Sequence, residues 1–354
     1  MTSGDYRTSL RWGILHGVND CVAGYMLSAY ALSADQPKAT LALIVYSILA
    51  FGGQLPVGLW LDAKRDMRLF SVVPVILLIA GCTLYFVSPF AAIVVAGFAS
   101  AGIHVTGGCI CLLLNKGKFG PLGVFTAPGV AGLAVGSFCG LLNSYWLILV
   151  IVTLFILFVP LVKGNFPAYA VAVKAKEDIL DSHDMVMIVL LLLMSIRSFL
   201  FDLLNTFSGQ FEYGLLVVGL GAFAGKIVGA FFADRIGWRR WVFITLPLSF
   251  VLLQLGHDNL LLLSFGIACL QSSVPITLQL MYNTLPHYPA TASALSLGTI
   301  VAFAGLPLYL TPLAPNFFNN SFGLFAIMLV VALVLLAAGF LFYLRSQQRG
   351  AAIK

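Results

Sequence analysis

Long apolar stretches separated by short polar breaks run along the whole chain. A helix needs about 20 apolar residues to cross the roughly 30 Å hydrocarbon core of a bilayer. The breaks fall at short clusters of proline, glycine, asparagine and charged residues. This pattern predicts twelve transmembrane helices, over residues 10–33, 40–62, 69–87, 90–114, 119–142, 145–163, 185–208, 213–233, 240–256, 259–284, 290–312 and 321–345.

The longest break divides these helices into two sets of six. It covers residues 164–184 and concentrates charged side chains, namely Lys174, Lys176, Glu177, Asp178, Asp181 and Asp184. We therefore predict an all-α membrane protein built from two six-helix bundles, residues 1–163 and 185–354, joined by a linker over 164–184.

The composition agrees with a membrane protein. The chain is 60% hydrophobic and 9% charged, whereas a soluble domain carries about 25% charged residues. Its formal net charge of +6 does not indicate nucleic acid binding, because the basic residues lie at the predicted helix ends. The first apolar stretch contains His16, Asn19 and Asp20 and has no small-residue cleavage site, so we expect no cleavable signal peptide.

The six cysteines all lie inside apolar stretches and are interpreted as small buried residues. Cys109 and Cys111 are spaced too closely to share one helix face, which argues against a metal site there. We expect no resident metal or cofactor, apart from a coupling ion such as the proton.

The basic residues also test the helix count. Sixteen of the nineteen Lys and Arg residues fall on one side of the predicted membrane, Lys38 falls on the other, and Arg197 and Lys226 lie within helices. Because positive charge gathers on the cytoplasmic side, we expect an even number of spans, with both termini and the linker in the cytoplasm. We expect a monomer in a bacterial inner membrane.

An internal repeat links the two halves. Residues 52–68 and 225–240 each carry an apolar, glycine-containing helix end, then an aspartate (Asp62 or Asp234), then a basic cluster. Glycines permit close helix packing, and the aspartate and basic residues could latch neighbouring helices at the cytoplasmic face.

This repeat resembles the major facilitator superfamily, which carries a G-x-x-x-D-R-x-G-R-R motif between helices 2 and 3 and a weaker copy between helices 8 and 9. The first copy keeps Gly58 and Asp62 but has Arg65 in place of the usual glycine. The second copy fits well and provides Asp234, Arg235, Gly237, Arg239 and Arg240. The resemblance implies two six-helix halves that bind substrate near the midplane and alternate in access.

A second motif lies in the fifth predicted helix. Gly123, Pro128, Gly129 and Gly132 resemble the G-x-x-x-G-P-x-x-G-G antiporter motif of exporters that exchange substrate for protons, with Ala127 and Ala131 replacing two glycines. The resemblance implies export. The alternative is that these residues only kink and pack a transmembrane helix.

Polar side chains deep in the membrane are costly and usually face a partner or a water-filled space. They gather in predicted helices 1, 4, 7 and 10, the helices that line the central cavity in the family that this chain resembles; Gln54 and Lys226 are the chief exceptions. The candidate substrate-binding and proton-binding residues are His16, Asn19, Asp20, His104, Arg197, Asp202, Asn205 and Gln271.

Asp20 is the leading candidate among them. It lies about ten residues, or roughly 15 Å, into its helix, and His16 precedes it by four positions on the same face. We predict that Asp20, tuned by His16, carries a proton or a cationic substrate. The alternative is a structural ion pair, for example with Arg197. Arg197 itself could bind an anion or hold the halves together, and His104 could contact substrate or another helix.

The stretch from His16 to Asp20 also resembles the start of the fosmidomycin-resistance-like branch of the superfamily, which implies efflux of a small compound. The leading hypothesis is a proton-coupled secondary transporter, and no enzyme motif is found. A divalent metal carrier that uses His16, Asp20 and His104, and a receptor-like protein that has the same fold but does not transport, remain alternatives. The expected partners are the bilayer and a small-molecule or ion substrate.

Overall fold

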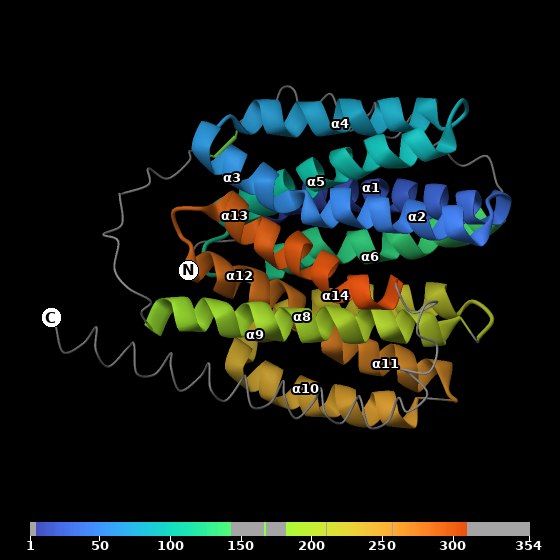
Figure 1. Cartoon of the computed structure of the whole chain (residues 1–354). Coiled ribbons are helices and arrows are strands. Elements are labelled where there is room, and N and C mark those ends of the chain that lie inside the picture. The colour runs from blue at the N-terminus through green and yellow to red at the C-terminus, as the bar shows by residue number, and fades with distance from the viewer. Residues whose placement is uncertain (1–4, 143–165, 168–181, 210, 257, 310–354) are drawn as a thin grey trace, which may run out of the picture.

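The computed structural model describes residues 5–142, 166–167 and 182–309, except 210 and 257. The first part consists of helices that run roughly parallel or antiparallel to one another (Figure 1). They are α1 (Tyr6–Ser33), α2 (Gln36–Ser47), η1 (Ile48–Gly52), α3 (Gln54–Lys64), α4 (Met67–Leu84), α5 (Pro89–Leu114) and α6 (Gly120–Leu141).

The second part lies below the first in the view of Figure 1. Its short helix α13 packs against α3 and α5 of the first part. Its elements are α8 (Ser182–Ser208), α9 (Gly214–Ile236), α10 (Trp238–Leu255), α11 (Leu260–Gln271), α12 (Val274–Thr284), α13 (Pro289–Ala294), η2 (Leu295–Thr299) and α14 (Ile300–Tyr309).

Ten of the twelve predicted spans coincide with these helical segments, and the other two, 145–163 and 321–345, lie outside the described residues. Within the described residues, seven helical segments are long and apolar enough to cross a membrane. The long helix α1 is not one of the seven, because His16, Asn19 and Asp20 lower its hydropathy. The chain is therefore an integral, multi-pass membrane protein.

Three spans that the sequence analysis treated as continuous helices are interrupted. A π-helical turn, η1, separates α2 from α3, and a second, η2, separates α13 from α14. Ser272 and Ser273 separate α11 from α12. The two π-turns contact each other, and Gly298 of η2 packs against the buried side chain of Gln54. Such turns insert a residue without changing the apolar character of a segment, so hydropathy does not reveal them.

The helices α1 and α6 form an extensive helix–helix contact in the first half. A Cβ atom at Gly132 would overlap the carbonyl of Gly17, and one at Gly136 would overlap the carbonyl of Cys21. Small residues of this kind let two membrane helices approach until their backbones touch. This close approach fixes the position of the polar residues that α1 carries.

Candidate proton and substrate site

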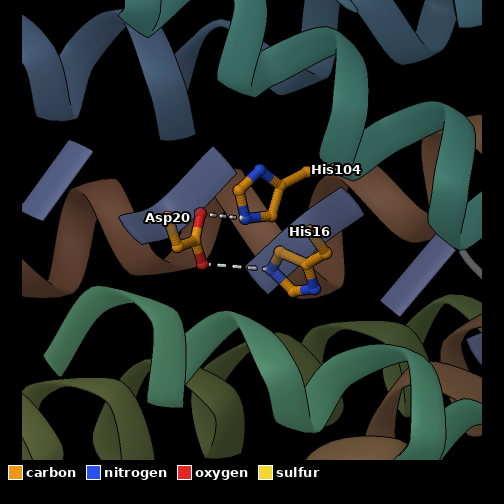
Figure 2. A group of neighbouring side chains, drawn as sticks. All are labelled: His16, Asp20 and His104. Carbon is orange, nitrogen blue, oxygen red and sulfur yellow. Dashed lines mark ion pairs between the residues drawn. The ribbon is translucent and has the colours of Figure 1, made fainter. Parts of the chain in front are cut away.

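Three ionisable side chains meet between α1 and α5. The carboxylate of Asp20 faces the imidazole rings of both His16 and His104, which lie next to each other (Figure 2). Its Oδ2 is 3.2 Å from Nε2 of His16, and its Oδ1 is 3.5 Å from Nε2 of His104. The two rings meet edge to face, with their centroids 4.4 Å apart. The predicted i, i+4 pair of His16 and Asp20 is confirmed, and the structure adds His104 to it.

In each histidine, a backbone carbonyl determines that Nδ1, the ring nitrogen that faces away from Asp20, carries a hydrogen. Nδ1 of His16 lies 3.1 Å from the carbonyl oxygen of Phe125, and Nδ1 of His104 lies 2.8 Å from that of Ser100. A carbonyl oxygen only accepts hydrogen bonds, so each Nδ1 must carry the hydrogen. In the neutral tautomer, each Nε2 is then a bare acceptor directed at the Asp20 carboxylate.

Two further polar side chains hold this cluster in place. Nδ2 of Asn19 donates to Oδ1 of Asp20 at 2.8 Å and to Oγ of Ser100 at 3.0 Å. The Ser100 hydroxyl also lies 3.2 Å from Nδ1 of His104. Asn19, Ser100, His16 and His104 are all buried, whereas Asp20 keeps some exposure. The network therefore ties the two helices together around one carboxylate.

The cluster has an excess of hydrogen-bond acceptors. A carboxylate and two neutral imidazole Nε2 atoms repel one another unless a positive charge lies among them. That charge can be one or two protons. It can also be a metal ion, because ligand atoms of His16, Asp20 and His104 all lie within 4.8 Å of one another.

Two positively charged side chains, Arg197 and Lys226, also lie within membrane-spanning helices. Arg197 on α8 is only 8% exposed, and its Nη1 donates to Oγ1 of Thr277 on α12 at 2.8 Å. Nζ of Lys226 on α9 donates to the carbonyl of Thr126 on α6 at 3.3 Å. Among the described residues, neither forms an ion pair with a carboxylate. The suggested ion pair between Asp20 and Arg197 is therefore absent, because Asp20 faces the two histidines and Arg197 faces Thr277.

Of the remaining candidates, Gln271 and Asp202 make no described contact with the histidine cluster. Gln271 is buried at the end of α11, where the helix breaks. Asp202 is partly buried on α8. The side chain of Asn205 lies outside the described residues.

The first copy of the repeated motif joins the two halves of the chain. Asp62, at the end of α3, accepts the backbone N–H groups of Ala290 at 3.1 Å and Thr291 at 2.7 Å. These groups begin α13, where free N–H groups favour a negative charge. Gly58 lies on the same contact, because a Cβ there would come within 2.9 Å of the Ala290 carbonyl.

The second copy makes the matching contact in the opposite direction. Asp234, near the end of α9, accepts the backbone N–H groups of Phe119 at 3.0 Å and Gly120 at 2.8 Å, at the start of α6. Gly237 ends α9 with a φ of +89°, a conformation that glycine adopts readily. The guanidinium of Arg239 lies 5.5 Å from the Trp238 ring centroid, while Arg235 and Arg240 are exposed.

The motif residues of the fifth predicted helix serve close packing. Gly123 faces Ala230 and the carbonyl of Lys226 on α9, and Pro128 packs against Gly17 of α1. A Cβ at Gly129 would overlap Nε2 of His16 and lie 2.7 Å from Oδ2 of Asp20. Gly129 therefore leaves the room that the histidine–aspartate pair occupies, and Gly132 packs on Gly17.

Sequence analysis missed three partners in these sites. Ser100 lies four residues before His104, a spacing that could have indicated their contact. Thr277 and the Phe125 carbonyl carried no comparable signal, because each pairs with a residue far away in the sequence.

No family model and no curated protein sequence matches the chain. Solved structures do match over nearly its full length. A fucose:proton symporter of E. coli, FucP, in a variant form, has a TM-score of 0.69 and 11% identity, covering 95% of this chain and 97% of its own. An outward conformation of FucP, titled a major facilitator superfamily transporter, gives 0.68 and 12%, covering 95% and 96%.

The human organic anion transporter MFSD10 gives a TM-score of 0.60 and 16% identity, covering 96% of this chain and 100% of its own. The chain has the major facilitator fold. At these identities the likeness establishes the fold alone. The fosmidomycin-resistance-like branch is not identified by these comparisons.

Proposed function

We propose that this protein is a secondary active transporter that moves a small solute by alternating access and couples the movement to protons. Asp20 is the proton-carrying group, and His16 and His104 share its proton. The major facilitator fold supports the transport role, because proteins of this architecture bind solutes between two halves that rock against each other.

One observation carries the proton coupling. Each histidine already commits its Nδ1–H to a backbone carbonyl, so both Nε2 atoms and the Asp20 carboxylate meet as acceptors. Such a group holds at least one proton, and it can bind and release protons without breaking the contacts that position it. A group with these properties at mid-membrane depth is what a proton-coupled carrier needs.

The two aspartate contacts provide a gate for alternating access. Asp62 and Asp234 each connect the end of one helix to the start of a helix in the other half. They lie at the basic end of the bundle, which we propose is cytoplasmic. Breaking both contacts would free the halves to separate on that side. The helix-5 motif from Gly123 to Gly132 supports export as the direction.

The proposal is tested in two steps. The purified protein is first screened for thermal stabilisation by drugs, sugars, organic acids and divalent metals, because a ligand that binds the folded state raises its apparent stability. The compound that stabilises most is then followed in proteoliposomes under an imposed pH gradient. We expect the gradient to drive accumulation, and Asp35→Asn, which alters an exposed carboxylate, to behave as wild type.

Transport that ignores the pH gradient would contradict proton coupling while leaving the transporter role intact. A protein that no compound stabilises and that moves none would instead favour a receptor-like role for this fold.

A divalent metal carrier is the second candidate, favoured by the same convergence of ligand atoms. Two imidazoles and a carboxylate suit Mn, Fe, Co or Zn, and histidines that donate Nδ1–H to carbonyls are typical of metal sites. Cobalt(II) added to the purified protein separates the two. Visible absorption bands that disappear in His104→Ala would establish the metal site, and their absence would favour the proton.

A further inference from the structure

Two positive charges within the membrane-spanning region, Arg197 and Lys226, form no ion pair with a described carboxylate. Arg197 is 92% buried, and its only described partner is the neutral hydroxyl of Thr277. In the part of the chain that the structure describes, the hydrogen-bond partner of Lys226 is the backbone carbonyl of Thr126, at the long distance of 3.3 Å. Removing a charge from water is costly unless an opposite charge compensates for it. The protein therefore maintains an arrangement that costs stability in the absence of another group.

The helices that hold these two groups contact one another. The helix α12, whose Thr277 binds Arg197, packs against α8, against α9, which carries Lys226, and against α6, which carries Thr126. Across this contact Arg197 and Lys226 repel each other, and Asp20 on α1 attracts Lys226. Asp20 is the only carboxylate among these neighbours, and it is already engaged with His16, His104 and Asn19. The pair of cations thus retains an excess of positive charge.

Arg197, Lys226 and their hydrogen-bond partners lie on four helices of the bundle. Arg197 lies on α8 and is held by α12, whereas Lys226 extends from α9 to the carbonyl of Thr126 on α6. A negatively charged group between them would contact the second half directly and approach α6 of the first half. Binding of such a group would favour closure of the two halves around it.

We propose that Arg197 and Lys226 form the binding site for an oxyanion, a carboxylate or phosphate group of the transported molecule. The planar guanidinium of Arg197 provides several donors in a fork that matches two oxygen atoms, and Lys226 adds a compact positive charge. This inference rests on the proposed transport function for its role, but the binding itself requires no proton gradient. It names the solute class as organic or inorganic anions.

The neighbouring proton site has a consequence for coupling. An ionised Asp20 attracts Lys226 and so competes with the oxyanion, and a proton on Asp20 removes that competition. Proton and anion then favour each other's binding and travel in the same direction. For an anionic solute this coupling favours uptake together with the proton, in contrast to the export that the helix-5 motif supports, and outward movement would need an outward anion gradient that exceeds the inward proton gradient.

Equilibrium binding tests the site without transport. Thermal unfolding of the detergent-solubilised full chain is measured with succinate, inorganic phosphate, phosphatidylglycerol in mixed micelles, and tetraethylammonium chloride as a cationic control, all at matched ionic strength. We expect at least one oxyanion to stabilise the wild type and tetraethylammonium to have no effect. Succinate or phosphate would indicate a soluble solute, and phosphatidylglycerol alone would indicate a lipid headgroup.

Variants assign the binding to these residues. Arg197→Gln and Lys226→Gln should each weaken oxyanion binding about tenfold or more, because each removes a charge-assisted hydrogen bond. The control Lys38→Gln removes an exposed lysine and should bind as wild type. Without ligand, Arg197→Gln should melt at the wild-type temperature or above it, since it removes an uncompensated buried charge.

Two results would overturn the inference. One is an oxyanion response that survives in both Arg197→Gln and Lys226→Gln. The other is the absence of any oxyanion response in wild type, with Arg197→Gln melting well below it, because that combination assigns Arg197 a structural role. Neither result bears on proton coupling, which is measured separately through pH-driven transport.

Discussion

The carboxylate of Asp62, at the end of α3, accepts the backbone N–H of Thr291, at the start of α13, at 2.7 Å. Asp234 repeats the relationship in the other direction, accepting the N–H of Gly120 at 2.8 Å. Each copy of the repeated motif therefore caps a helix of the opposite half. Asp62 and Asp234 thus make two similar contacts between the halves at one end of the bundle.

Loss of both caps should open that end. An N-terminal cap contributes about 1 kcal/mol, and two separate caps add, so the double variant Asp62→Ala/Asp234→Ala should shift the balance by about 2 kcal/mol, roughly 30-fold. Maleimide labelling of Ser293→Cys, a fully buried position on α13, in a background without the native cysteines, reports this opening. A labelling rate equal to that of the capped protein would argue against the gate.

Gly129 should be intolerant of any side chain. In Gly129→Ala the added methyl group would overlap His16 and crowd Oδ2 of Asp20, so the histidine–aspartate pair must separate. We expect pH-driven transport in proteoliposomes to fall at least about tenfold, with a lower melting temperature.

The matched control for that change is Gly52→Ala. A Cβ at Gly52 meets no atom within 4 Å, and alanine is the better helix former, so this variant should transport and melt as wild type or slightly better. Normal transport by Gly129→Ala would show that transport does not require the contact between His16 and Asp20.

Ser100 should position the cluster through its hydroxyl. Its Oγ accepts from Asn19 and contacts Nδ1 of His104, so Ser100→Ala leaves a buried Asn19 donor with one partner fewer, at a cost of about 1 kcal/mol. We expect the pH midpoint of transport to move, with the protein still folded. Ser71→Ala is the comparison, since the described hydrogen bond of that buried hydroxyl goes to the Met67 carbonyl of its own helix. An equal effect from both variants would point to general packing.

Asp5 should make stability depend on pH at the start of α1. The N–H of Thr8 holds the pKa of the Asp5 carboxyl below its usual value. The ionised form is therefore the stabilising one, and its contribution is complete above the unfolded pKa of about 3.9 and is lost as pH falls through the lower, folded pKa. The melting-temperature difference between wild type and Asp5→Ala should be larger at pH 7 than at pH 3. A difference that grows as the pH is lowered would contradict this assignment.

Much of the fold followed from local pattern. Apolar runs located the described spans, because crossing a bilayer requires length and hydropathy that the sequence states directly. The π-turns η1 and η2 were not predicted because a π-turn changes helix register without a change in hydropathy. The break at Ser272 and Ser273 was within reach of the sequence, because a polar pair and Pro275 mark it. Spans 145–163 and 321–345 stay predictions.

The candidate site was partly predictable for a similar reason. His16 and Asp20 share a helix face, so their pairing follows from helical spacing. The contact of His104 with Asp20 depends on how α1 and α5 pack. The resemblance implied which helices line the cavity, but not which of their side chains meet. The contact between Arg197 and Thr277 spans 80 residues, and no local pattern encodes it. Lys226 stood out only as an isolated charge in an apolar helix.

Proton counting in the Asp20→Asn variant tests the central claim most directly. Proteoliposomes that contain the pH-sensitive dye pyranine are given an outward or inward gradient of the best-stabilising solute, and internal pH is recorded. Wild type should move protons with the solute, whereas Asp20→Asn should still bind the solute and exchange it between compartments while moving no protons. Proton movement in Asp20→Asn equal to that of wild type would contradict the assignment of Asp20 as the proton carrier.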